Sequence, residues 1–334
     1  MTDRLHSLRS GWVVALLLLP LQIFAQLTYD LGWWQMQPGN YSGITPIGDE
    51  RYAIVSDQEK NSGFFVWQIE MDSLTGQIRN VVNEGFRSAN DSIDLDAEGI
   101  AFCAETGTLF VSRESDQRIV EHNLDGSLTG RELAIPEWAV RIHIRSNRGF
   151  VALGYDPERK LLWTTTESPL KEDSALMLRF MAFDSDLQLQ STFPYQLDPE
   201  QAPNHGRDHY HGVVAITPYQ DGLLVLEREC RIAPNYSGSR CWCKLFYFLP
   251  EAGTKQLLDV WQTDFNILNV TMANYEGMCL GPKLSNGLQT VLLISDSQAG
   301  FGIGLWHLRD FLRVTAVPDM SQENPEQPDD QTTE

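Results

Sequence analysis

Five acidic residues recur along this sequence at the ends of short hydrophobic segments that are typical of β-strands. Each follows a glycine-containing entry, a first strand and a turn, and consecutive acids are separated by 57, 53, 62 and 67 residues. Carboxylates gathered in one place repel one another unless protons, arginines or cations neutralise them. Oxygen ligands of this kind suit calcium. The five acids are Asp57, Glu114, Glu167, Glu229 and Asp296.

Two further carboxylates stand at the beginning of a repeat, each directly before a glycine. They are Glu98 in "EGIAF" and Glu276 in "EGM". Glycine permits close approach of the backbone, and the acid could bind a metal or act as a base. The alternative is a turn carboxylate that accepts hydrogen bonds from nearby backbone N–H groups. We predict Glu98, Glu276 and Glu114 as catalytic candidates, and all seven carboxylates as candidate calcium ligands.

Two arginines precede closing acids, Arg113 in "VSRE" and Arg228 in "LERE". The planar guanidinium can bind a phosphate or carboxylate through two N–H groups. Both are therefore predicted to bind an anionic substrate, although each could instead be a structural counter-charge within a ring of acids.

The segment "NHGRDHYHG" (204–212) leads directly into the fourth repeat and contributes His205, His209 and His211. Histidines in this place could act as general acids or as transition-metal ligands. Their spacing matches no zinc signature, so an ordinary polar loop is the alternative. A second basic segment, "RIHIRSN", would place His143 and Arg145 on one face of a strand, where they could hold an anion. A solvated strand edge is the alternative there.

The elements that must position these residues are strands, because the sequence shows almost no helical periodicity and β-rich runs alternate with Gly, Asn, Asp and Pro turns. The spacing of the repeats is typical of a β-propeller, in which the inner strands of successive blades converge on a central channel. An all-β propeller of six blades is predicted, with the segments 27–34 and 302–312 closing the ring together. The five visible repeats are residues 41–57, 98–114, 148–167, 211–229 and 275–296.

The repeats resemble the phytase-like β-propeller family, which is described as having esterase-like activity. The matching elements are "YSGI…YAIVSD", "DAEGIAF…LFVSRES", "NRGFVALGYDPERKLLWTTTE" and "NYEGM…LLISDSQ", over roughly residues 40 to 300. The resemblance implies a six-bladed propeller, export and calcium-assisted cleavage of phosphate esters. The chain departs from the family in two repeats. Members typically carry a glutamate where the third repeat of this chain has Val151. The fourth repeat also lacks this glutamate and has Val213 instead. These departures favour a non-catalytic propeller as the alternative.

The two ends of the chain differ from the repeats. Residues 1–25 combine Arg4 and Arg9 with the apolar run "WVVALLLLPLQIF", the pattern of a cleaved secretory signal. We therefore expect an exported, soluble protein, periplasmic or extracellular, with no membrane insertion after the signal is removed. The propeller domain is expected over residues 26–316 and a disordered acidic tail over residues 317–334.

Five cysteines follow the signal, and in an oxidising compartment Cys230 could pair with Cys241 or with Cys243. An odd number leaves at least one thiol free.

The charge and the absent motifs limit the function. The net charge of −20 repels nucleic acid and anionic membranes. No GxSxG, GxGxxG, P-loop or HExxH motif is present, which removes support for serine hydrolases, nucleotide cofactors and zincins. The leading hypothesis is a monomeric, calcium-assisted phosphoesterase for a small anionic substrate at the channel mouth. The alternatives are a propeller that binds a ligand or protein partner at the cell envelope, and a carboxylester or lactone hydrolase using Asn147 and Asn274 as neutral ligands.

Overall fold

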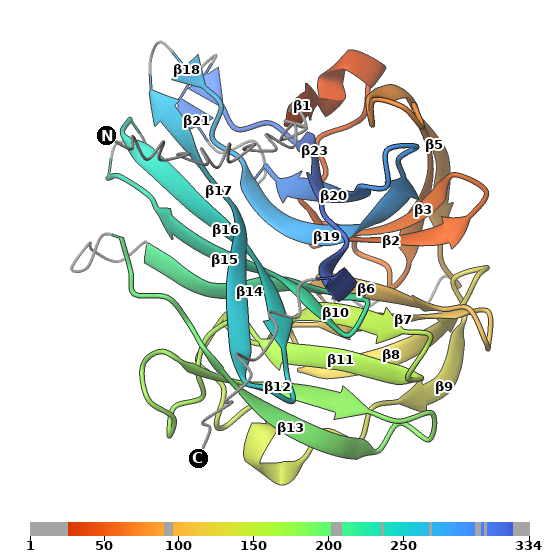
Figure 1. Cartoon of the computed structure of the whole chain (residues 1–334), viewed down its shortest axis with the longest axis vertical. Coiled ribbons are helices and arrows are strands. Elements are labelled where there is room, and N and C mark those ends of the chain that lie inside the picture. The colour runs from red at the N-terminus through yellow and green to blue at the C-terminus, as the bar shows by residue number, and fades with distance from the viewer. Residues whose placement is uncertain are drawn as a thin grey trace, which may run out of the picture.

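Five β-sheets surround a central axis in the computed structural model of the chain (Figure 1). The structure describes residues 26–89, 96–201, 209–234, 237–266, 269–297, 302–303 and 306–322. Each sheet is one propeller blade whose first strand lies nearest the axis. The number of blades is five, so the expectation of six was wrong. Of the two segments expected to close the ring in a sixth blade, residues 27–30 and 311–312 instead belong to the fifth blade, and residues 302–303 pair with 306–307 in a separate hairpin.

The first three blades are four-stranded antiparallel meanders. Blade 1 contains β2 (Tyr41–Gly48), β3 (Arg51–Ser56), β4 (Phe64–Met71) and β5 (Ile78–Arg87). Blade 2 contains β6 (Ala97–Cys103), β7 (Thr108–Arg113), β8 (Arg118–Asn123) and β9 (Leu128–Glu132). Blade 3 contains β10 (Phe150–Asp156), β11 (Leu161–Thr166), β12 (Met177–Phe183) and β13 (Leu189–Gln196).

The last two blades depart from this plan. Blade 4 contains β14 (His209–Tyr219), β15 (Gly222–Arg231), β16 (Ser239–Leu249), β17 (Thr254–Asn266) and the short β18 (Asn269–Val270). Blade 5 contains β19 (Asn274–Lys283), β20 (Gln289–Asp296), β23 (Phe311–Val317) and β1 (Leu27–Asp30). A small hairpin and three 3-10 helices complete the described elements: β21 (Gly302–Ile303), β22 (Trp306–His307), η1 (Leu31–Trp34), η2 (Glu137–Ala139) and η4 (Met320–Gln322).

The second strand of each blade is buried almost throughout, because neighbouring blades cover both of its faces. β7, for example, is buried at all six positions, and β3 at all except its first residue. Such strands read as continuous hydrophobic runs rather than as alternating ones. The turn between β2 and β3 is made by Asp49 and Glu50, both with positive φ, as a two-residue type I′ hairpin requires.

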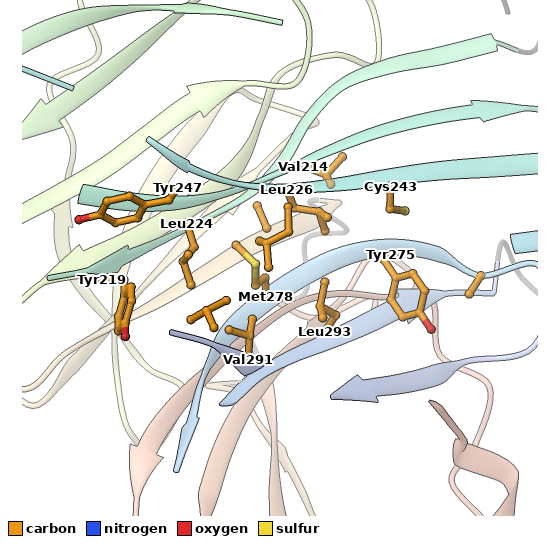
Figure 2. Close-up of a cluster of buried hydrophobic side chains, with 14 of the residues drawn as sticks. Val214, Tyr219, Leu224, Leu226, Cys243, Tyr247, Tyr275, Met278, Val291 and Leu293 are labelled. Carbon is orange, nitrogen blue, oxygen red and sulfur yellow. The ribbon is translucent and has the colours of Figure 1, made fainter. Parts of the chain in front are cut away.

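The hydrophobic core lies between the blades. Where blades 4 and 5 meet, Leu224 and Leu226 of β15 pack near Met278 of β19 and Leu293 of β20 (Figure 2). Burial of each such side chain contributes about 1.5–3 kcal/mol relative to exposure. This packing holds the inner strands in fixed positions around the axis.

The two ends of the propeller close the ring in one sheet, as the sequence predicted. β1 pairs antiparallel with β23, with Leu27 opposite Val314 and Asp30 opposite Phe311. The fold also extends beyond residue 316, where a tail was expected. Val317 belongs to β23 and is 1% exposed, and Met320 is buried in the core. Residues 1–25, the expected signal, and residues 323–334 lie outside the described residues.

The disulfide of the structure joins Cys230 to Cys241, which face each other on β15 and β16 with a Cα–Cα distance of 4.1 Å. This decides between the two pairings that the sequence allowed. Cys243 remains a buried free thiol, as do Cys103 and Cys279. Among the described residues, no helix is long and apolar enough to cross a bilayer.

Candidate functional site

Every inner strand carries a β-bulge at the same place relative to the end of the second strand of its blade. In blade 1 the pairing register shifts by one residue between Tyr41 and Gly43, and the other four blades shift at the equivalent position. A bulge leaves one residue out of the pairing and re-aims its side chain. The residues at these shifts all line one central cavity of about 240 Å³: Ser42, Glu98, Val151, Val214 and Glu276.

A second ring of side chains lies where the second strand of each blade ends. In blades 1 to 3 the backbone N–H of Asp57, Glu114 and Glu167 donates, at 2.8 to 3.2 Å, to the carbonyl of the residue directly before the inner strand. The corresponding registered pairs in blades 4 and 5 are Gly212 with Arg228 and Asn274 with Asp296. All five ring residues line the cavity: Asp57, Glu114, Glu167, Arg228 and Asp296. The predicted convergence is thus confirmed for four of the five closing acids.

The fourth blade corrects the prediction by one residue. Arg228 holds the ring position that the sequence alignment gave to Glu229. Because side chains alternate along a strand, this shift puts Glu229 on the opposite face. There it accepts a hydrogen bond from the backbone N–H of Gln201 at 2.6 Å and lies 3.1 Å from Nε2 of His209. Similarly, the bulged position of this blade is Val214, not Val213.

The residue opposite each ring member determines whether the charge of that ring member is compensated by a hydrogen bond. Asn40 donates to Asp57 at 3.2 Å, and Asn274 donates to Asp296 at 3.3 Å. In blade 2 the opposite residue is Asp96, so two carboxylates face each other there. With Glu98 they form a cluster: Asp96, Glu98 and Glu114 each place a carboxylate oxygen within 4.8 Å of the others.

This cluster fits a hard divalent cation, because calcium takes carboxylate oxygens as ligands. Seven carboxylates but only two arginines, Arg148 and Arg228, are found among the described residues that line the cavity. Beside the cluster, Oδ1 of Asp57 is buried and has no hydrogen-bond partner in the described part of the chain. The donor set therefore has room for a cation on the side of blades 1 and 2. The sequence missed Asp96, although it stands two residues before Glu98 in the same segment.

Arg228 neutralises the opposite side of the cavity. Its Nη1 donates to Glu276 and to Asn274, and its Nη2 donates to Glu167, each at 2.5 Å. The side chain is 4% exposed. Arg228 therefore acts as a structural counter-charge, which was the alternative to its binding an anionic substrate.

Burial raises the pKa of several of these carboxyls, because desolvation penalises their charged form. The pKa of Asp57 is raised to about 7 by burial and then by the charge of Glu276. The pKa of Glu276 is raised to about 8 by burial and then by Asp296, despite Arg228. Burial and then four neighbouring acids also raise the pKa of Glu98 well above its ordinary value. Without a cation, part of the ring is therefore protonated near neutral pH.

A second guanidinium enters the cavity from blade 3. Arg148 stacks on the ring of Tyr210, 4.3 Å from its centroid, and its Nη1 donates to Glu167 at 3.2 Å. Both residues line the cavity. Sequence reasoning missed this pair, although alternation along "HYH" would have separated Tyr210 from the histidines on either side.

The remaining predicted anion-binding residues do not line the cavity. Arg113 is buried and paired with Asp116. His143 contacts Glu172 at 2.9 Å, and Nε of Arg145 donates to the carbonyl of Pro169 at 3.0 Å. Residues 141–143 form a turn instead of the expected strand, so the shared face does not exist.

The two described histidines of the fourth-repeat entry also point away from the central cavity. His209 contacts Glu229, and His211 lies 3.8 Å from Glu200. Burial lowers the pKa of His211, which favours its neutral form. Both residues therefore belong to the packing between blade 4 and the segment before it.

The family described as "Phytase-like: Esterase-like activity of phytase" matches residues 37–298, which include all five inner strands. The chain belongs to this phytase-like family. The resemblance stated from the repeats is therefore confirmed, and both rings of this family member lie within the matched region. No curated protein matches its sequence.

Solved structures with a similar fold have very different sequences. The exo-β-1,3-galactanase 1,3Gal43A from Clostridium thermocellum is 10% identical, with a TM-score of 0.50 over 85% of this chain and 60% of that chain. The endo-arabinase from Bacteroides thetaiotaomicron is 11% identical, with a TM-score of 0.48 over 85% of this chain and 95% of that chain. At 10% identity the likeness to the galactanase concerns the fold alone, because one fold supports many functions.

Proposed function

We propose that this phytase-like propeller is an exported hydrolase of small anionic esters, in the first place phosphoric esters, assisted by calcium. The observation that carries the proposal is the cluster of Asp96, Glu98 and Glu114 within 4.8 Å of one another. The facing pair of carboxylates in blade 2 stands where blades 1 and 5 pair an acid with an asparagine. A bound divalent cation is the simplest compensation for three converging carboxylates.

Bound calcium would supply charge screening for the ester and a lowered pKa for a coordinated water. The chain's own residues then bind and orient the substrate. Arg148 can bind the anionic group, because it lines the cavity and its guanidinium plane is held by Tyr210. During hydrolysis the water oxygen bonds to phosphorus, the ester P–O bond breaks, and the released alcohol takes up a proton. Asp57 and Glu276 line the cavity and can accept and return protons.

Export is proposed from two features. The first 25 residues have the pattern of a secretory signal. The disulfide between Cys230 and Cys241 is of a kind that persists in oxidising compartments. A periplasmic or extracellular location supplies the calcium that the site would need.

A non-catalytic binding propeller is the second candidate, and one observation favours it. Two of the five bulged positions hold valines, Val151 and Val214, so blades 3 and 4 add no acid at this level of the cavity. This apolar part of the cavity would suit a ligand that only binds as well as a substrate that reacts.

Calcium binding to the purified, exported chain tests the proposal, measured by isothermal titration calorimetry beside an Asp96→Asn/Glu98→Gln variant. We expect one calcium site that the variant loses, together with calcium-dependent release of phosphate from a simple monoester. A matched Asp125→Asn/Glu105→Gln variant changes two acids outside the cavity lining and should bind calcium normally. Absence of calcium binding in the unmodified chain would overturn the mechanism, and binding without turnover would favour the second candidate.

A further inference from the structure

The cavity has two chemically different sides. Its seven carboxylates come from blades 1, 2, 3 and 5, whereas blade 4 and the segments next to it contribute apolar groups beside Arg228. Together with Val151 of blade 3, these groups form what we term the apolar wall: Val151, Tyr210, Val214, Ile232 and Met272. Apolar area of this kind favours an apolar ligand surface, because contact removes both surfaces from water.

Positive charge is scarce in the same cavity. Among the described lining residues, the cations are Arg148 and Arg228. Arg228 already donates to Glu167, Glu276 and Asn274, so its terminal nitrogens serve the protein itself. Arg148 is more exposed, at 17% of its side chain, and it borders the apolar wall through its contact with Tyr210.

A substrate with many phosphates does not suit this arrangement. Each additional anionic group would enter a cavity whose described lining holds seven carboxylates, and it would find no further cation there. An unpaired charge in such surroundings is strongly disfavoured. One anionic group beside Arg148, with an organic group against the apolar wall, adds less negative charge to this cavity than several phosphates would.

We propose that the substrate is a monoester whose single anionic group is attached to a compact apolar body, such as an aryl or branched alkyl monophosphate, and not a polyphosphate. The proposal rests on the proposed calcium-assisted hydrolysis and names its substrate class. Tyr210, Val214 and Met272 are then specificity-determining residues, and Arg148 is the residue that binds the anion.

Equilibrium binding of three probes to the full exported chain tests this proposal at one fixed free calcium concentration. The probes are phenylphosphonate, methylphosphonate and inositol hexakisphosphate, and the first two carry a C–P bond that hydrolysis cannot cleave. We expect phenylphosphonate to bind about tenfold more tightly than methylphosphonate, because its ring contacts the apolar wall. Equal affinity for these two, or tighter binding of the hexakisphosphate, would overturn the proposal.

Variants locate the effect. Val214→Thr keeps the side-chain shape and should weaken phenylphosphonate severalfold while leaving methylphosphonate unchanged. Val82→Thr makes the same change on the half-exposed strand β5, away from the cavity, and should alter neither affinity. Arg148→Gln should weaken both phosphonates. If Val214→Thr weakens both phosphonates equally, or neither, the apolar wall does not bind the substrate and the proposal fails.

Failure of this proposal is distinguishable from failure of the proposed function. Selective binding of phenylphosphonate without hydrolysis of phenyl phosphate would support the ligand class and contradict the enzyme. Calcium-dependent hydrolysis that prefers a polyphosphate would support the enzyme and overturn the substrate class.

Discussion

Arg228 on β15 donates a hydrogen bond to Glu276 on β19 at 2.5 Å, which joins blades 4 and 5 across the cavity wall. The same guanidinium contacts Glu167 of blade 3. One buried cation therefore connects three consecutive blades at a ring position that is acidic in the other four. The candidate metal cluster belongs to blade 2, two blades away around the ring.

Replacement of Arg228 by methionine should lower the free energy of unfolding by about 3–5 kcal/mol, because two buried carboxylates lose their counter-charge. Urea denaturation measures the loss. The triple variant Arg228→Met/Glu167→Gln/Glu276→Gln removes those charges as well and should recover most of the stability. If the triple variant is no more stable than the single one, Arg228 acts through its packing and not through charge.

The calcium-free protein should lose stability as the pH rises. Asp57 and Glu276 have pKa values raised to about 7 and about 8, against about 4 in the unfolded chain. The folded state therefore binds more protons between these limits, and the stability from both groups is present below pH 4 and lost as the pH rises to about 8.

Thermal unfolding in a chelator between pH 5 and pH 8.5 (about the range in which these groups titrate) measures this effect as a falling Tm. Asp57→Asn should make the fall smaller, since its group no longer titrates. Added calcium should raise the Tm more at the upper end of the range than at the lower end. A Tm that the Asp57→Asn change leaves equally pH-dependent would contradict the raised pKa.

Gly99 should tolerate no side chain, because a Cβ there would lie 2.2 Å from the carbonyl oxygen of Val151 in the next blade. Gly99→Ala should therefore destabilise the protein by about 3 kcal/mol or more, measured by urea denaturation. Gly107 provides the comparison, since its added Cβ meets nothing within 4 Å but its φ is +66°. Gly107→Ala should cost only about 1 kcal/mol. Equal losses in both variants would show that the blades can move apart at Gly99.

The disulfide should stabilise the hairpin of β15 and β16. Removing it with Cys230→Ala/Cys241→Ala should lower the free energy of unfolding by about 2–4 kcal/mol. Peptide mapping should find Cys230 linked to Cys241 and the thiols of Cys103, Cys243 and Cys279 unmodified until the protein unfolds. Cys243→Ala should leave the disulfide intact, and its disappearance in that variant would contradict the assigned pairing.

Much of the fold was present in the sequence, because repetition is visible without coordinates. The strand–turn–strand repeats predicted a propeller, and Asp57, Glu114, Glu167 and Asp296 do converge on one cavity. The number of blades was not accessible in this way. It depends on whether β1 and β23 form their own sheet or add to β19 and β20, and that is decided by the pairing of β23 with β20, in which Leu292 lies opposite Val314.

The sequence also could not predict which residues form the site where a shift of one residue in strand pairing changes the answer. "LERE" offers three charged side chains at the end of β15, and only its pairing with β14 selects Arg228 for the cavity and turns Glu227 and Glu229 away. Asp96 and Arg148 likewise become site residues through contacts with other segments, with Glu114 and with Tyr210. The sequence alone determined a repeated β-fold with converging carboxylates. Tertiary structure decided which side chains converge, because a bulge or a shift of one residue reverses the face of a strand to which each side chain points.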